Sequence, residues 1–142
     1  MPKRSPVAER RAELIRTALL GVAPGGMTLM RLAGACELSR WQTRRALAAL
    51  KDICAQNHWP TLTWTRDLGY HFCGNEDELE LWEQAWLDAK LVQFGRALTS
   101  VIGPHLELFP QSLWAIYLKD QVRAVESALA LAAEQLAARR RR

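Results

Sequence analysis

Apolar residues recur at helical spacing near the start of the chain. They follow Pro6, a residue type that often begins a helix, and arginines lie between them: Val7, Leu14, Ile15, Ala18, Leu19 and Val22. The run ends at residues 23–26, an Ala-Pro-Gly-Gly cluster that breaks helices. The pattern therefore predicts one amphipathic helix from Pro6 to this cluster.

Two further helices are predicted from residues that can cap them. Thr28 can cap a short second helix, and Ser39 can cap a third. Gln42 stands three residues after Ser39 and completes a capping box. The apolar stripe of the third helix consists of Thr43, Ala46, Leu47, Leu50, Ile53 and Cys54. The opposite side carries Arg40, Trp41, Arg44, Arg45, Ala48 and Lys51.

A change of period after Pro60 predicts a β-hairpin. Pro60 disfavours helix in the residue before it, so the third helix ends near residues 57–60. Residues 61–65 then alternate in character, residues 66–69 form a turn that contains a glycine, and residues 70–72 are again β-type. Arg66 falls in the predicted turn.

The spacing of apolar residues in the second half of the chain predicts helices. Asn75 or Asp77 can cap a helix whose apolar residues include Leu79, Trp82, Trp86, Leu87, Leu91, Phe94 and Leu98. Gly103-Pro104 is expected to break it. Gln111 or Ser112 then begins a last helix, and a seam of about three heptads runs through Leu118, Val122, Val125, Leu129, Ala132 and Leu136.

Composition agrees with a small globular protein. The 142 residues are 49% hydrophobic and 24% charged, which suffices for a core and is too short for an enzyme with separate cofactor and substrate lobes. The net charge of +4 is unevenly distributed. Residues 1–75 carry a net charge of +6, residues 76–138 carry −6, and residues 139–142 add +4. Two parts of the chain therefore meet different partners.

Residues 8–73 resemble a winged helix-turn-helix domain, and residues 28–53 carry the resemblance. In that family the second helix supports the third across a tight turn with a buried apolar residue, here Leu38, and a capping residue, here Ser39. The resemblance implies a mainly α fold of three helices plus a β-hairpin wing over residues 1–75. It also implies a third helix that enters the DNA major groove. Residues 76–142 resemble the helical dimerisation arms that many such regulators append.

The expected DNA contacts follow from residue chemistry on these elements. A capped helix directs its free N–H groups toward phosphate, arginine can form two hydrogen bonds with guanine, and glutamine can do so with adenine. Thr28 and Arg31 at the supporting helix are expected to contact the DNA backbone, and Arg66 in the wing is expected to contact the minor groove or a phosphate. Trp41 suits packing on a sugar or a thymine methyl, and equally suits folding back onto the wing or a partner subunit. The expected DNA-binding residues are Thr28, Arg31, Ser39, Arg40, Trp41, Gln42, Arg44, Arg45 and Arg66.

The C-terminal helices are expected to pair two copies of the chain. The residues proposed for dimerisation are Leu79, Trp82, Trp86, Leu118, Val122, Val125, Leu129 and Leu136. The same seam also suits a helical hairpin within one chain. Residues 139–142, all arginine, suit either a tail that adds nonspecific DNA affinity or a solvated end.

Other chemistry finds less support. Cys54, His58, His71 and Cys73 could converge on zinc, but their spacing matches no standard zinc pattern, and core cysteines are the better reading. A thiol redox sensor would require an exposed cysteine of low pKa. There is no phosphate-binding glycine loop, nucleophile elbow or metalloprotease motif, so we expect neither catalysis nor a cofactor. Without an export signal or a membrane span, the expected location is cytoplasmic.

The sequence thus predicts a sequence-specific regulator of transcription that binds double-stranded DNA. The simplest form is a homodimeric repressor on a pseudo-palindromic operator. The alternative is a winged-helix interaction protein of a plasmid or phage replication, partition or recombination assembly. In that case the acidic helices would recruit a protein partner.

Overall fold

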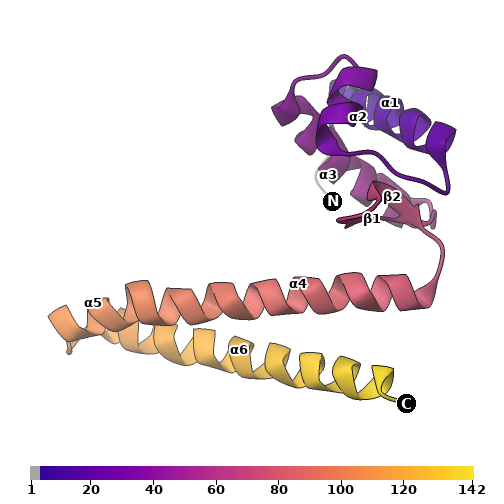
Figure 1. The fold of residues 1–142 in the computed structure, drawn as a ribbon. Coiled ribbons are helices and arrows are strands. Elements are labelled where there is room, and N and C mark those ends of the chain that lie inside the picture. Colours follow the sequence, from indigo (N-terminus) through magenta and orange to yellow (C-terminus); the bar gives the residue numbers. More distant parts are fainter. Residues whose placement is uncertain (1–3) are drawn as a thin grey trace. The chain divides into compact units, whose positions relative to one another are not determined.

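The computed structural model describes residues 4–142 and is mainly helical (Figure 1). The chain divides into two compact units, unit 1 (residues 1–79) and unit 2 (residues 80–142), and the division falls within helix α4. The elements in chain order are α1 (Pro6–Val22), α2 (Leu29–Ala35), α3 (Arg40–Gln56), β1 (Thr61–Thr65), β2 (Gly69–Cys73), α4 (Glu76–Ala97), a π-helical turn η1 (Leu98–Ile102), α5 (Gly103–Leu108) and α6 (Leu113–Arg140).

The core of unit 1 forms where α1, α2 and α3 meet the hairpin. The predicted first helix is confirmed, with Pro6 as its first residue and Ser5 as its cap. Its apolar stripe meets that of α3, and the buried cluster contains Ala12, Ile15, Leu19, Leu32, Ala46, Leu47, Ala49, Leu50, Cys54 and Leu62. This burial fixes the rotation of α3 about its axis, because the stripe must face the core.

The turn between α2 and α3 is closed by backbone hydrogen bonds. The N–H of Leu38 donates to the Ala33 carbonyl at 2.9 Å, and the N–H of Glu37 donates to the Gly34 carbonyl at 3.3 Å. This is the Schellman arrangement, and Glu37 takes the left-handed conformation (φ 53°) that it requires. Leu38 then packs against the core. The turn therefore sets where α3 can begin.

The capping predictions for α2 and α3 are confirmed. The Thr28 side chain accepts a hydrogen bond from the N–H of Arg31 at 3.3 Å. The Ser39 hydroxyl accepts from the N–H of Gln42 at 3.1 Å, and the Gln42 side-chain oxygen accepts from the N–H of Ser39 at 2.9 Å. Both predicted partners of the capping box are thus formed.

The predicted hairpin is confirmed as an antiparallel pair in which Thr61 lies opposite Cys73 and Thr65 opposite Gly69. A contact that the sequence pattern did not reveal joins it to the segment before α2. Met27 and Tyr70 exchange two backbone hydrogen bonds, at 3.0 and 2.8 Å. A Cβ on Gly26 would stand 2.5 Å from the Tyr70 carbonyl oxygen, so only glycine permits this approach.

His71 joins the other face of the hairpin to the first turn of α4. Its buried ring bonds through Nδ1 to the Gly69 carbonyl at 2.9 Å, while Nε2 faces the Glu78 carboxylate and the Thr63 hydroxyl. The hydrogen bond from His71 lowers the pKa of Glu78, although burial opposes the shift.

In unit 2, the expected helix break at Gly103-Pro104 is wrong. α4 continues without interruption through η1 into α5, with Pro104 in the first turn of α5. Proline lacks an N–H, and the wider π turn in front of it accommodates that loss. The N–H of Gly103 reaches back five residues to the Leu98 carbonyl, and a Cβ on Gly103 would stand 2.9 Å from that oxygen.

The long helix then meets α6 as an antiparallel pair, with the two lying side by side in Figure 1. Ser112 caps α6, as one of the two predicted residues. The Nε of Arg139 lies 2.9 Å from a carboxylate oxygen of Glu80, and a Cβ on Gly95 would lie 3.9 Å from a carboxylate oxygen of Glu126. Across residues 4–142, no helix combines the length and apolar character needed to cross a membrane.

The contact between Gly26 and the hairpin can be tested by adding one methyl group. Gly26→Ala places its Cβ against the carbonyls of Leu68 and Tyr70, so we expect it to lower the free energy of unfolding by about 1 to 3 kcal/mol. Gly21→Ala is the matched control, because nothing lies within 4 Å of its Cβ. Urea denaturation of both variants measures the difference. Equal stabilities would contradict the close approach.

The His71–Glu78 contact predicts a pH-dependent term in stability. Because the pKa of Glu78 is lowered in the fold, its contribution is present above the ordinary value of 4.5 and is lost as pH falls through the lower folded value. We therefore expect Glu78→Gln to be less stable than the wild type at pH 7, with a gap that narrows below pH 4.5. Glu83→Gln on the same helix is the control. Urea denaturation at several pH values checks this, and a gap that does not change with pH would contradict it.

Candidate nucleic-acid interface

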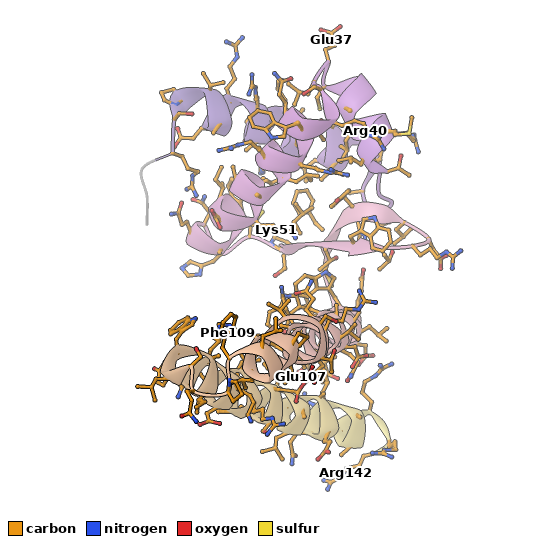
Figure 2. All side chains as sticks on the ribbon, turned by 90° about the vertical axis from the view of Figure 1, so that its left-hand side faces the viewer. Glu37, Arg40, Lys51, Glu107, Phe109 and Arg142 are labelled. Atoms are coloured by element: carbon orange, nitrogen blue, oxygen red, sulfur yellow. The ribbon has the colours of Figure 1, made fainter. Side chains whose placement is uncertain are left out.

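The exposed side of α3 carries three arginines without acidic partners. Arg40, Arg44 and Arg45 all face solvent, as the helical period predicts, while Thr43 and Leu47 between them are buried. Within residues 4–142, none of the three arginines forms an ion pair. Figure 2 labels Arg40 at the start of this side, with Lys51 further along the helix. The surface is therefore available to an anionic ligand.

Trp41 lies beside this arginine row. Its ring is 63% exposed, and the Cζ of Arg45 lies 5.0 Å from the ring centroid, within cation–π range. Both side chains border an open groove of about 720 Å³ between the start of α1 and α3, which Arg11 also lines. An exposed aromatic ring held by a cation offers a flat apolar surface next to positive charge.

The capping box restricts what Ser39 and Gln42 can contact. The Gln42 oxygen accepts the hydrogen bond from the N–H of Ser39, and the Ser39 hydroxyl accepts from the N–H of Gln42. A two-bond contact with adenine needs that same glutamine oxygen. In this conformation Gln42 positions the start of α3, and its oxygen already accepts one hydrogen bond within the capping box.

The supporting residues are exposed and gather at two places. Thr28 and Arg31 lie at the start of α2, and Arg66 lies in the turn of the hairpin. The pairing of Met27 with Tyr70 brings the start of α2 alongside the hairpin, and a Cβ on Gly69 would stand 3.0 Å from the backbone nitrogen of Thr28. Thr28 therefore lies next to the strand that leaves the Arg66 turn.

Among the exposed apolar residues of unit 1 that were not predicted as contacts, two lie beside predicted ones. Trp64, opposite Tyr70 in the hairpin, and Met30, between Thr28 and Arg31, both face solvent. The alternating pattern places Trp64 on the same face as Leu62, which is buried in the core. An aromatic residue two positions before a turn arginine was the signal that could have identified it.

The alternative chemistry at the cysteines and histidines is not supported by their surroundings. Burial raises the pKa of the Cys36, Cys54 and Cys73 thiols, which opposes formation of reactive thiolates. His71 is engaged by Gly69, Thr63 and Glu78, as described above. Over the part of the chain that the structure describes, no three His, Cys, Asp or Glu side chains are grouped so as to hold a metal ion.

The residues expected at a dimer seam are divided by the structure. Leu118, Val122, Leu129 and Leu136 are half-buried along α6. Leu79 and Trp82 of α4 are also half-buried, whereas Trp86 and Val125 are exposed. The α6 residues lie in a helix already paired with α4 of the same chain, which is the second of the two arrangements that the sequence allowed.

Comparison with known proteins adds no further constraint. No protein-family model matches the chain, and searches of curated proteins and of solved structures give no match. Its function is therefore inferred from the residues themselves.

Proposed function

We propose that this chain is a sequence-specific regulator of transcription that binds double-stranded DNA through unit 1. The observation that carries the proposal is the row of Arg40, Arg44 and Arg45, exposed and without ion pairs on a Ser39-capped helix. A helix of about 10 Å diameter fits the major groove, and arginine is the residue that most often recognises guanine there.

The order of elements supports a winged helix-turn-helix arrangement. α2 and α3 meet across the Glu37–Leu38 turn, and the hairpin follows α3 directly. The short pairing between Met27 and Tyr70 adds a third backbone segment beside the hairpin. Under this proposal α3 is the recognition helix, α2 supports it and the hairpin is the wing.

The proposed roles follow from the geometry of each side chain. Arg44 and Arg45 lie one turn into α3 and are assigned to base edges. Arg40, in the first turn, and the free N–H groups there are assigned to phosphate. Arg66, with exposed Trp64 nearby in sequence, contacts the backbone or the minor groove from the wing. Trp41 supplies apolar contact to a sugar or a thymine methyl.

The proposed regulator acts as a homodimer, most simply as a repressor. A pseudo-palindromic operator presents two equivalent half-sites, which two copies of unit 1 would read together. The acidic residues at the start of α4, Glu76, Asp77 and Glu78, repel phosphate and would keep that part of the chain away from the duplex.

The recognition helix can be tested by removing two charges. Arg44→Ala with Arg45→Ala should weaken binding by about 1 to 3 kcal/mol for each lost base contact and relax sequence preference. Arg123→Ala, an exposed arginine in unit 2, is the control for loss of charge and should bind like the wild type. Fluorescence anisotropy with duplexes selected from a random library measures both effects. Unchanged affinity and unchanged preference in the double variant would show that α3 is not the reader.

The role of the hairpin predicts a different signature. Arg66→Ala should reduce affinity to a similar degree for all duplexes and lower the salt slope by about one phosphate contact, with sequence preference retained. Titrations at several salt concentrations test this. Selective loss of affinity for one base pair would instead assign Arg66 to base recognition.

A further inference from the structure

The turn between α5 and α6, at one end of unit 2, lies in a stretch of chain without charged residues. Residues 108–118 contain no Asp, Glu, Lys or Arg and include the turn from α5 into α6. Leu113 is 82% exposed, Leu108 74% and Phe109 62%. We call the exposed residues at this end the turn patch: Leu108, Phe109, Leu113, Trp114, Ile116 and Tyr117. Figure 2 shows unit 2 from this end and labels Phe109.

Unit 2 has little apolar core of its own. Leu87, Ile102 and Ala115 are its only buried hydrophobic residues. In contrast, twelve of the nineteen exposed large hydrophobic residues within residues 4–142 belong to unit 2, and six of these twelve form the turn patch. These six residues all lie within residues 108–117, and monomeric soluble proteins rarely leave a large apolar patch uncovered. We therefore expect a partner to cover the turn patch.

The accessible surface of the whole chain is large enough to supply a partner contact. It amounts to 10083 Å², against about 8,900 Å² for two separate compact units of these lengths. A stable protein–protein contact buries about 800 Å² on each partner, so the chain has surface enough for one specific interface.

The shape of the turn patch suits contact with an identical surface. An open hollow of about 660 Å³ is lined by His105, Leu108, Phe109 and the following residues to Ser112. Beside it project Leu113 and Trp114. In a two-fold contact each copy must supply both a projection and a recess, and this end of unit 2 offers both.

Charge also favours a second copy at this position. In a two-fold contact, residues near the axis face their own equivalents, so a charged residue there meets a like charge. The acidic start of α4 and the arginines at the end of α6 would repel their copies in this way. The uncharged residues 108–118 avoid this repulsion.

The aromatic residues of the turn patch make ring contacts within unit 2. The rings of His105 and Phe109 meet edge to face at 5.9 Å, and those of Trp114 and Tyr117 lie 6.2 Å apart. Restricted side chains lose less entropy on association, and exposed Trp and Tyr are the residues that dominate binding energy at interfaces.

We propose that two copies of the chain associate through the turn patch, with Leu113 and Trp114 of each copy entering the hollow of the other. This proposal rests on the proposed function only for the existence of a homodimer. It assigns the dimer contact to a different surface from the one predicted from the sequence. The interface is the α5–α6 turn rather than the Leu118–Leu136 seam, whose members are half-buried beside α4 of their own chain.

The test places a charge in the turn patch of the full chain. Leu113→Glu and Trp114→Glu, each made separately, lie in the first turn of α6, where a carboxylate favours the helix. Leu131→Glu is the matched control on the same helix, exposed but outside the turn patch. Sedimentation equilibrium without DNA measures self-association, and circular dichroism checks that the variants remain folded.

We expect a micromolar or tighter dimer for the wild type and for Leu131→Glu, weakened roughly thirtyfold or more by either turn-patch variant. Folded turn-patch variants that dimerise as tightly as the wild type would overturn the proposal. A monomeric wild type would also overturn it. If that monomer co-floated with phosphatidylcholine vesicles in a density gradient, the turn patch would be assigned to lipid instead. Because this measurement uses no DNA, a negative result would not affect the proposal that α3 reads DNA. Likewise, unchanged DNA binding by the Arg44→Ala/Arg45→Ala variant would not affect the proposed dimer contact.

Discussion

The burial of one stripe of α3 constrains the rest of unit 1. Thr43, Leu47 and Leu50 are almost completely removed from water against α1, α2 and the hairpin. A helix has one rotation that buries such a stripe, so this packing also decides that Arg40, Arg44 and Arg45 face outward. The apolar core and the basic surface are thus two results of one helical period.

The hairpin gives that core a second boundary. One face supplies Leu62 to the core, while the other buries Thr63 and His71 near the first turn of α4. Strand β2 is further held by the segment before α2 through Met27 and Tyr70. The hairpin therefore contacts the core, the start of α4 and the segment before α2, and these contacts restrict the position of its charged turn.

Local signals in the sequence predicted most elements because their physical causes are local. The capping residues Thr28 and Ser39, the breaker at residues 23–26 and the alternation in residues 61–65 act within a few positions. Contacts between distant residues were not predictable in this way. The bonds of Met27 to Tyr70 and of His71 to Glu78 depend on tertiary packing, and Gly103-Pro104 is tolerated only because a π turn precedes it. For the candidate site, exposure of the arginines followed from period. The role of Gln42 in the capping box was also local enough to predict, and its contact with DNA stays a prediction.

The ion pair between Arg139 and Glu80 has a practical consequence for the ends of the chain. It places the C-terminal residues at the end of unit 2 where α4 enters, and only Gly74 and Asn75 separate α4 from β2. The turn between α5 and α6 lies at the opposite end of unit 2. An affinity tag, fluorophore or fused domain attached after Arg142 would therefore emerge beside the start of unit 2 and leave the turn unobstructed. A C-terminal fusion would thus report on the proposed self-association without covering the turn patch.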